Sequence, residues 1–340
     1  MDEEKKRDNH YVPRLYLKQW SNNGSTVWTY DTIVWNRGQK VWRPVGVGGV
    51  ACWKDFYSQI NDDEIVDDSI EILFGDEYES RAGDVFKKVR NGNDLTSDDM
   101  ALLVDFAILQ MVRTPVWLLK SSTLMASVFP SAATEMLGKL GTDYKAGLLT
   151  KRDVHEKVRS LPDNAPFPQF EIGVDVDVRA GEIAVSLPLG RKNYLANVGR
   201  VLRGDVGKCM RGFDWSVLEM PNGVLLPTCD NPFVRLCVRA GMMPTLNGAV
   251  GDPNTHLFMP LMSHHLMYAN AGGARLDRRR LTGESSLVNL ISGSIVQNAL
   301  RYVYDCKRSD WIVELRPRRV DPEYCSKMRD VMTHWNELQE

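Results

Sequence analysis

The pattern of hydrophobic and polar positions predicts strands in the first sixty residues and helices directly after them. Residues 33–35 and 40–42 are rich in strand-forming residues and flank Asn36-Arg37-Gly38-Gln39, which predicts a hairpin turn. From about Asp63, apolar residues recur at spacings of three and four, the period of a helix. The run Asn91-Gly92-Asn93 ends that predicted helix.

The next predicted helix carries the first polar side chains of interest. Ser97 is expected to cap it, and residues 102–112 are apolar almost all round, so the helix should be buried. Gln110 and Arg113 lie on one face of it, and burial requires partners for them because an unpaired buried charge is costly. Arg113 can belong to a functional site, or it can end the helix and pair with an acid. Residues 114–115, Thr-Pro, end or kink the helix.

The second half of the chain mixes both kinds of element. We predict helices over residues 121–160, 193–210, 285–304 and 321–338. We predict strands over residues 215–219, 224–227, 256–259 and 265–268, the first two joined by a turn. Helices and strands do not alternate as βαβ units, so the sequence favours an α+β fold with mixed helices and a central, mainly antiparallel sheet. We expect a single domain over residues 1–340, with a subdomain boundary, if any, near the proline-rich loop at 161–170.

Composition places the chain among ordinary globular proteins. Its 340 residues are 43% hydrophobic and 25% charged, which argues against extensive disorder. The start is charged and lacks an apolar signal segment, and the longest apolar run is too short and too polar to span a bilayer. We therefore expect a soluble cytoplasmic protein that does not bind membranes. The six cysteines show no CxxC spacing and are expected to be reduced residues of the core.

The net charge of −2 hides an uneven distribution. Residues 180–320 hold 18 Lys and Arg against 11 Asp and Glu, whereas residues 61–79 are strongly acidic. The basic half includes a cluster formed by Arg275, Arg278, Arg279 and Arg280. A local basic face can bind a phosphate backbone, although a solvated surface loop is the more common explanation of an arginine-rich loop. The charge distribution permits a nucleic-acid partner without requiring one.

Three places in the sequence could carry chemistry. The segment Asn9-His10-Tyr11-Val12-Pro13 is rich in polar and aromatic residues, and histidine can serve as acid, base or hydrogen-bond donor. Thr228-Cys229-Asp230-Asn231-Pro232 follows a predicted strand, where sites are commonly built, although an Asx turn also accounts for it. Glu79 is one acid among many on a predicted helix. No zinc-binding spacing such as HExxH occurs, and we expect no metal or cofactor.

These places together resemble a known family. The run from Asn9 to Lys18 resembles the defining motif of the bacterial HYVP-motif proteins, catalogued as domain of unknown function 4238. The likeness continues in order through residues 55–57, 79–82, 110–115, 228–232, 258–261 and 298–304. It therefore spans nearly the whole chain, and its first motif is the most specific. Cys229 stands where such proteins usually carry serine, so no role is assigned to it.

Some members of that family are associated with anti-phage defence, as DNA glycosylases that remove modified bases from phage DNA. The resemblance therefore implies excision of a modified base, for example a glucosylated hydroxymethyl-cytosine, to leave an abasic site. Cleavage of an N-glycosidic bond passes through an oxocarbenium-like state and needs a nearby carboxylate. It also needs groups that hold an extruded base and cations that hold phosphates.

The residues can be matched to those requirements. The expected catalytic residues are Glu79, Asp230 and His10. The expected substrate-binding residues are Asn9, Tyr11, Gln110, Arg113 and Asn231, and the expected contacts to the DNA backbone are Arg275, Arg278, Arg279 and Arg280. The motifs contain no lysine except Lys18, so a Schiff-base lyase step is less attractive. Two alternatives stay open: a nuclease in which Glu79, Asp230 and His10 hold Mg²⁺, and a non-catalytic sensor that binds nucleic acid or a phage protein.

Overall fold

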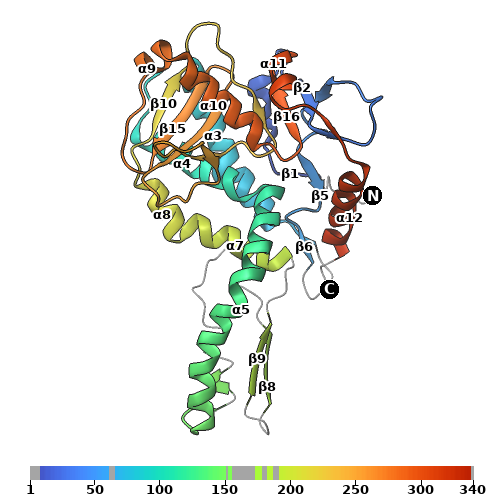
Figure 1. Ribbon diagram of the computed structural model, residues 1–340, viewed down its shortest axis with the longest axis vertical. Helices are drawn as coiled ribbons and strands as arrows, with labels where there is room; N and C mark the ends of the chain where they lie inside the picture. Colours follow the sequence, from blue (N-terminus) through green and yellow to red (C-terminus); the bar gives the residue numbers. More distant parts are fainter. Residues whose placement is uncertain are drawn as a thin grey trace.

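A computed structural model of the chain describes residues 8–60, 66–150, 152–154, 173–177, 182–186 and 191–337. Its core is built on two antiparallel sheets (Figure 1). The larger sheet has the strand order β10 (Ser216–Glu219), β15 (His265–Asn270), β14 (Thr255–Met262), β12 (Val234–Cys237) and β13 (Thr245–Leu246). The smaller sheet has the order β11 (Thr228–Cys229), β16 (Tyr302–Asp305), β2 (Thr26–Asp31) and β4 (Trp42–Gly46). The predicted α+β class is thus confirmed.

Four short strand pairs complete the described sheets. They are β1 (Asp8–His10) with β5 (Cys52–Lys54), β3 (Ile33–Val34) with β17 (Arg319–Val320), β6 (Gln59–Ile60) with β7 (Val66–Asp67), and β8 (Gly173–Asp177) with β9 (Glu182–Ser186). All are antiparallel except β3 with β17, which is parallel. The first pair matters most here, because it fixes residues 9–13, which we call the HYVP segment, against the rest of the protein.

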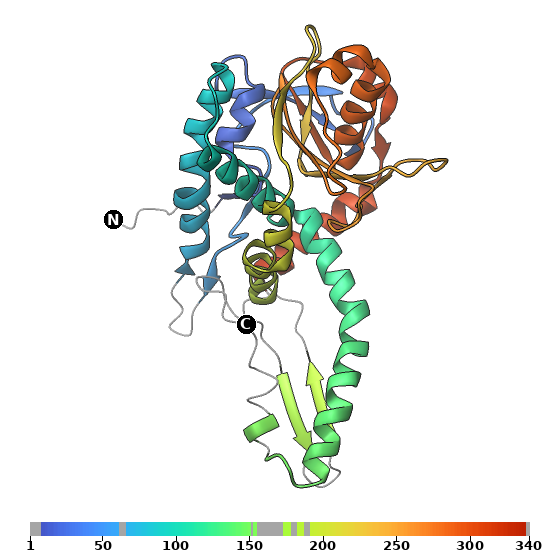
Figure 2. The same cartoon turned by 90° about the vertical axis from the view of Figure 1, so that its left-hand side faces the viewer.

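The described helices are spread over both halves of the chain. In the first half these are α1 (Arg14–Leu17), a 3₁₀ turn (Lys18–Trp20), α2 (Ser69–Leu73), a π-helix (Phe74–Glu79), α3 (Ser80–Arg90), α4 (Ser97–Val112) and α5 (Pro115–Lys145). In the second half they are α7 (Arg191–Arg203), α8 (Asp205–Arg211), α9 (Arg278–Gly283), α10 (Ser285–Asn298), α11 (Asp310–Leu315) and α12 (Pro322–Glu337). The long helix α5 leaves this body and runs alongside the β8–β9 hairpin (Figures 1 and 2).

The alternation of side chains along β14 divides the core into two parts. Leu257 and Met259 belong to a cluster shared with α3 and α4, whereas Phe258 belongs to a second cluster shared with α10. The larger sheet is therefore buried on both faces. Tyr16 ties the HYVP segment to this core, because its hydroxyl group lies 2.8 Å from that of Thr228 and donates to the carbonyl of Pro260 at 2.6 Å.

Several local predictions were wrong. The predicted hairpin over residues 33–42 does not form, because β3 pairs with β17 and β4 pairs with β2. Residues 224–227 are not a strand, and β10 pairs instead with β15. The cap of α4 is Thr96 rather than Ser97, in a capping box with Asp99. Residues 66–67 form β7, so the helical region that was expected from about Asp63 begins at Ser69.

Two predicted helices were too long. The one expected over residues 193–210 is divided between α7 and α8 at Gly204, where a Cβ atom would lie 2.4 Å from the carbonyl oxygen of Arg200. The one expected over residues 285–304 ends at Asn298, and Tyr302 begins the strand β16. The expected boundary near 161–170 lies outside the described residues. Among those that are described, no single helix is long and apolar enough to cross a membrane, and one bent pair, α4 with Pro115–Ser121, reaches that length and apolarity only together.

Candidate functional site

The HYVP segment is a buried structural junction. Asn9 and His10 lie on β1, opposite Trp53 and Cys52 of β5. The side-chain oxygen of Asn9 accepts a hydrogen bond from the backbone N–H of Tyr57 at 2.9 Å. The Tyr11 ring makes edge contacts with the rings of Trp53 and Phe56. Because only 4% of Asn9 and 4% of Tyr11 is exposed, both side chains shape the segment 51–57 and do not face solvent.

Arg113 is the polar centre to which this segment connects. Its side chain is fully buried and donates to Glu79 Oε1 at 2.6 Å, to the Tyr57 hydroxyl at 3.4 Å and to the backbone carbonyl of His10. Its guanidinium group also lies over the ring of Phe74, 4.9 Å from the centroid. Arg113 therefore joins four segments that are far apart in the sequence. It ends α4 and pairs with an acid, as the second of the two alternatives expected.

We call His10, Arg14, Tyr57, Glu71, Glu79 and Arg113 the Arg113 cluster. Burial by itself would lower the pKa of Arg113, but Tyr57, Glu79 and Glu71 together raise it above its usual value. Burial, and then the nearby charge of Arg14, lower the pKa of His10 to about 4. His10 is consequently neutral near pH 7, and its Nε2 accepts a hydrogen bond from Arg14 at 3.2 Å. It is placed to orient Arg14, which is exposed.

Glu71 is a member of the cluster that the sequence reasoning missed. Burial raises its pKa to about 7; Arg113 opposes this shift and Glu79 adds to it. One of its carboxyl oxygens, Oε2, is buried and has no hydrogen-bond partner among the described residues. Glu71 lies eight residues before Glu79, about two helical turns, and that spacing within the acidic run was the signal available in the sequence.

The π-helix between α2 and α3 positions the acidic side of the cluster. It begins at Phe74, under the guanidinium of Arg113, and ends at Glu79, which binds that guanidinium. A π-helix adds a residue to the ordinary helical turn and is found most often at functional sites. The side chain of Glu79 is 20% exposed, so the ion pair opens towards solvent at this end.

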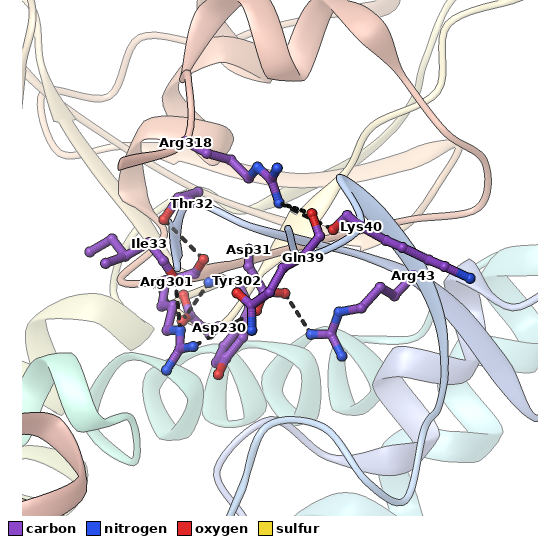
Figure 3. A network of polar contacts seen from close by, with 10 residues as sticks. All are labelled: Asp31, Thr32, Ile33, Gln39, Lys40, Arg43, Asp230, Arg301, Tyr302 and Arg318. Carbon is purple, nitrogen blue, oxygen red and sulfur yellow. Dashed lines mark hydrogen bonds and ion pairs between the residues drawn. The ribbon is translucent and has the colours of Figure 1, made fainter. Parts of the chain in front are cut away.

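Asp230 has a different position from the one expected. Its Oδ1 accepts from the backbone N–H of Leu300 at 2.7 Å. Its Oδ2 accepts from the backbone N–H groups of Arg301 at 2.8 Å and Tyr302 at 2.9 Å, two residues that Figure 3 draws beside Asp230. Burial raises its pKa to about 6, although these three hydrogen bonds oppose that shift. Asp230 thus holds the chain between the end of α10 and the start of β16, and it fixes β16 beside β11. Its oxygens are occupied by backbone donors, so we assign it a structural role.

The neighbouring polar predictions have mixed outcomes. The amide oxygen of Asn231 lies 3.4 Å from its donor, the Thr114 hydroxyl, and its amide group donates to the carbonyl of Asn298 at 3.1 Å. Asn231 therefore lies next to the cluster but not in it. Gln110 is fully buried, yet neither polar atom of its side chain has a partner among the described residues.

The predicted DNA-backbone arginines lie apart from the cluster. Arg275, Arg278 and Arg280 form exposed ion pairs with Asp214, Glu219 and Glu284, at 2.6, 2.7 and 3.4 Å. Three of these four arginines are on α9, at the upper left of Figure 1, whereas β1 and β5 lie at its centre. Arg279 is exposed. Within the described residues, no three His, Cys, Asp or Glu side chains gather in a way that could hold a metal ion, and Glu79, Asp230 and His10 do not form one site.

The fold and this cluster define an α+β protein in which one buried arginine joins an N-terminal motif to two acidic side chains. The chain belongs to the family described as Protein of unknown function (DUF4238), whose model matches residues 8–309. That range contains every residue of the Arg113 cluster. No curated protein and no solved structure matches the chain.

Proposed function

We propose that this protein is a DNA glycosylase that excises a modified base from phage DNA and leaves an abasic site. The observation that carries the proposal is the presence of two carboxyl groups in different environments at one buried arginine. Glu79 is paired with Arg113 at 2.6 Å, while Glu71 has a buried oxygen without a partner among the described residues. Enzymes that cleave glycosidic bonds commonly separate the roles of two carboxyl groups in this way.

The two groups suit complementary steps of the same reaction. The bond from C1′ of the sugar to the nitrogen of the base breaks, and the sugar becomes positively charged. The Glu79 carboxylate, paired with Arg113, stabilises that charge, orients the water that adds to C1′ and accepts the proton that this water loses. Glu71, with a pKa of about 7, can hold a proton near neutral pH and donate it to the departing base.

The remaining cluster residues support these two groups. Arg113 has no exposed surface, so it positions Glu79 and is not expected to touch DNA. Arg14 is exposed and can contact a phosphate beside the extruded nucleotide. His10 orients Arg14 through the hydrogen bond to its Nε2. In this account the HYVP segment supports the site by holding Arg113 and Arg14 in place.

The test uses purified protein with unmodified DNA and with DNA that carries glucosylated hydroxymethyl-cytosine, in the presence of EDTA. A glycosylase produces alkali-labile sites in the modified DNA without direct nicks. Nicks that EDTA abolishes would instead identify a metal-dependent nuclease, and a mobility shift without cleavage a non-catalytic binder. Glu77→Gln is the matched control for Glu79→Gln, because Glu77 is exposed on the same π-helix.

A further inference from the structure

A shallow pocket lies where α4 meets α5. It is lined in part by Met111, two residues before Arg113, and by Lys120 and Trp117 on the first turns of α5. Its free space, including the open mouth, is about 310 Å³. Most of that space belongs to the open mouth, so the pocket suits a small polar group better than a whole nucleobase.

Two cations line this pocket, and no acidic side chain of the described residues is paired with either of them. Arg235 of β12 is partly buried and has no carboxylate partner among the described residues. Lys120 donates to the neutral amide oxygen of Asn247 at 2.5 Å. Burial lowers the pKa of both side chains, and the charge of Arg235 lowers that of Lys120 further. Arg235 is partly buried and lies near the exposed Lys120, so the two like charges repel each other and an anion between them would relieve that repulsion.

Neutral groups in the same pocket point to the same kind of ligand. The indole N–H of Trp117 is buried and has no acceptor within the described part of the chain. Asn247 adopts a left-handed backbone conformation with φ of 71°, which asparagine tolerates in turns, and its side chain accepts the hydrogen bond from Lys120. By contrast, Arg239, which follows β12, has an acid partner, because it binds Asp252 at 2.5 Å. The arginine next along the chain is thus neutralised by an acid, whereas Arg235 has no such partner among the described residues.

We propose that the pocket binds a phosphate group, with Lys120 and Arg235 supplying the positive charge and Trp117 a hydrogen bond. A phosphate fits better than a carboxylate because its larger number of oxygens can accept hydrogen bonds from both cations and from the indole N–H together. The phosphate can belong to a DNA backbone or to a free phosphorylated compound. Asn231, which lines the pocket, bonds to Thr114 next to Arg113, and this places the pocket beside the proposed active site. Only the DNA source rests on the proposed glycosylase function.

The first arm of the test measures thermal unfolding during titration with inorganic phosphate, against chloride at equal ionic strength. The melting temperature of the wild-type protein and of Arg239→Gln should rise with phosphate, and that of Arg235→Gln and Lys120→Gln should not. Without phosphate, Arg235→Gln should be at least as stable as wild type, because it removes an unpaired charge. An equal response of Arg235→Gln and wild type to phosphate would overturn the proposal.

The second arm identifies the source of the phosphate. Binding of a DNA duplex is measured over a range of salt concentrations for the same four proteins. If the pocket holds a backbone phosphate, the slope of log K against log salt should fall by about 0.9 in each pocket variant and stay unchanged in Arg239→Gln. Unchanged slopes with a lost phosphate response would assign the pocket to a free phosphorylated compound. A phosphate response in a protein without glycosylase activity would refute the proposed function alone.

Discussion

Replacing Arg113 by methionine tests whether this side chain holds the cluster together. The change keeps an unbranched chain packed on Phe74 and Tyr57, but removes the ion pair to Glu79 and the hydrogen bonds to the Tyr57 hydroxyl and the His10 carbonyl. All three hydrogen bonds have the charged guanidinium as donor, and one such bond contributes about 1.5–3 kcal/mol, although contributions within one network do not add in full. The expected loss of unfolding free energy is therefore about 3–5 kcal/mol, the usual cost of breaking a buried pair.

That loss converts into a measurable change in thermal stability. The entropy of unfolding is about 2.1 cal/mol/K per residue, so each kcal/mol shifts the melting temperature of a protein of this size by about 1.4 °C. Arg113→Met should accordingly melt about 4–7 °C below wild type in calorimetry. In a Glu79→Gln background the same change should cost about 1–2 kcal/mol less, since the charged partner is already absent.

The control is Arg239→Met, which removes an ion pair whose arginine side chain is 53% exposed. Solvent screens exposed pairs of this kind, and they contribute little to stability, so this variant should melt close to wild type. Arg113→Met melting as close to wild type as that control, or losing equal stability with and without Glu79, would refute the reasoning.

Three further predictions concern separate parts of the fold. Burial raises the pKa of Glu71 to about 7 in the folded protein, so the stability that its protonated form contributes is complete in acid and is lost as the pH rises to about 7. Between acid and pH 7, urea denaturation should therefore show a smaller loss of stability for Glu71→Gln than for wild type. Thr96→Ala removes the capping box of α4 and should cost about 1 kcal/mol by the same measurement. Gly207→Ala should cost about 1–3 kcal/mol, because its Cβ would lie 2.4 Å from a backbone oxygen, whereas Gly83→Ala on α3 meets no atom within 4 Å and should be neutral or stabilising.

The sequence predicted what depends on local periodicity. The apolar positions of 102–112 identified a buried helix, and the spacing of Gln110 and Arg113 placed both side chains in the interior, where the structure has them. The family resemblance over the motifs is also confirmed by the match to residues 8–309. These predictions succeeded because helical period and short motifs are properties of neighbouring residues.

The rest could not be predicted because it depends on contacts distant in the sequence. Asp230 is a plausible catalytic residue until Leu300, Arg301 and Tyr302 are seen to donate their backbone N–H groups to it from about 70 positions away. Glu71 is one of many acids in residues 61–79, and which of these acids is buried follows only from the fold. Pairing partners of short strands, such as β3 with β17, likewise follow from tertiary packing.

The measurement that tests the central claim most directly is the yield of alkali-labile sites in glucosylated DNA, with EDTA present, for wild type, Glu79→Gln, Glu71→Gln and Glu77→Gln. The account predicts activity in wild type and in Glu77→Gln, and loss of activity by about 10²-fold or more in the other two, the usual effect of removing an acid–base or charge-stabilising group. Full activity in both Glu79→Gln and Glu71→Gln, with all four proteins folded, would contradict it.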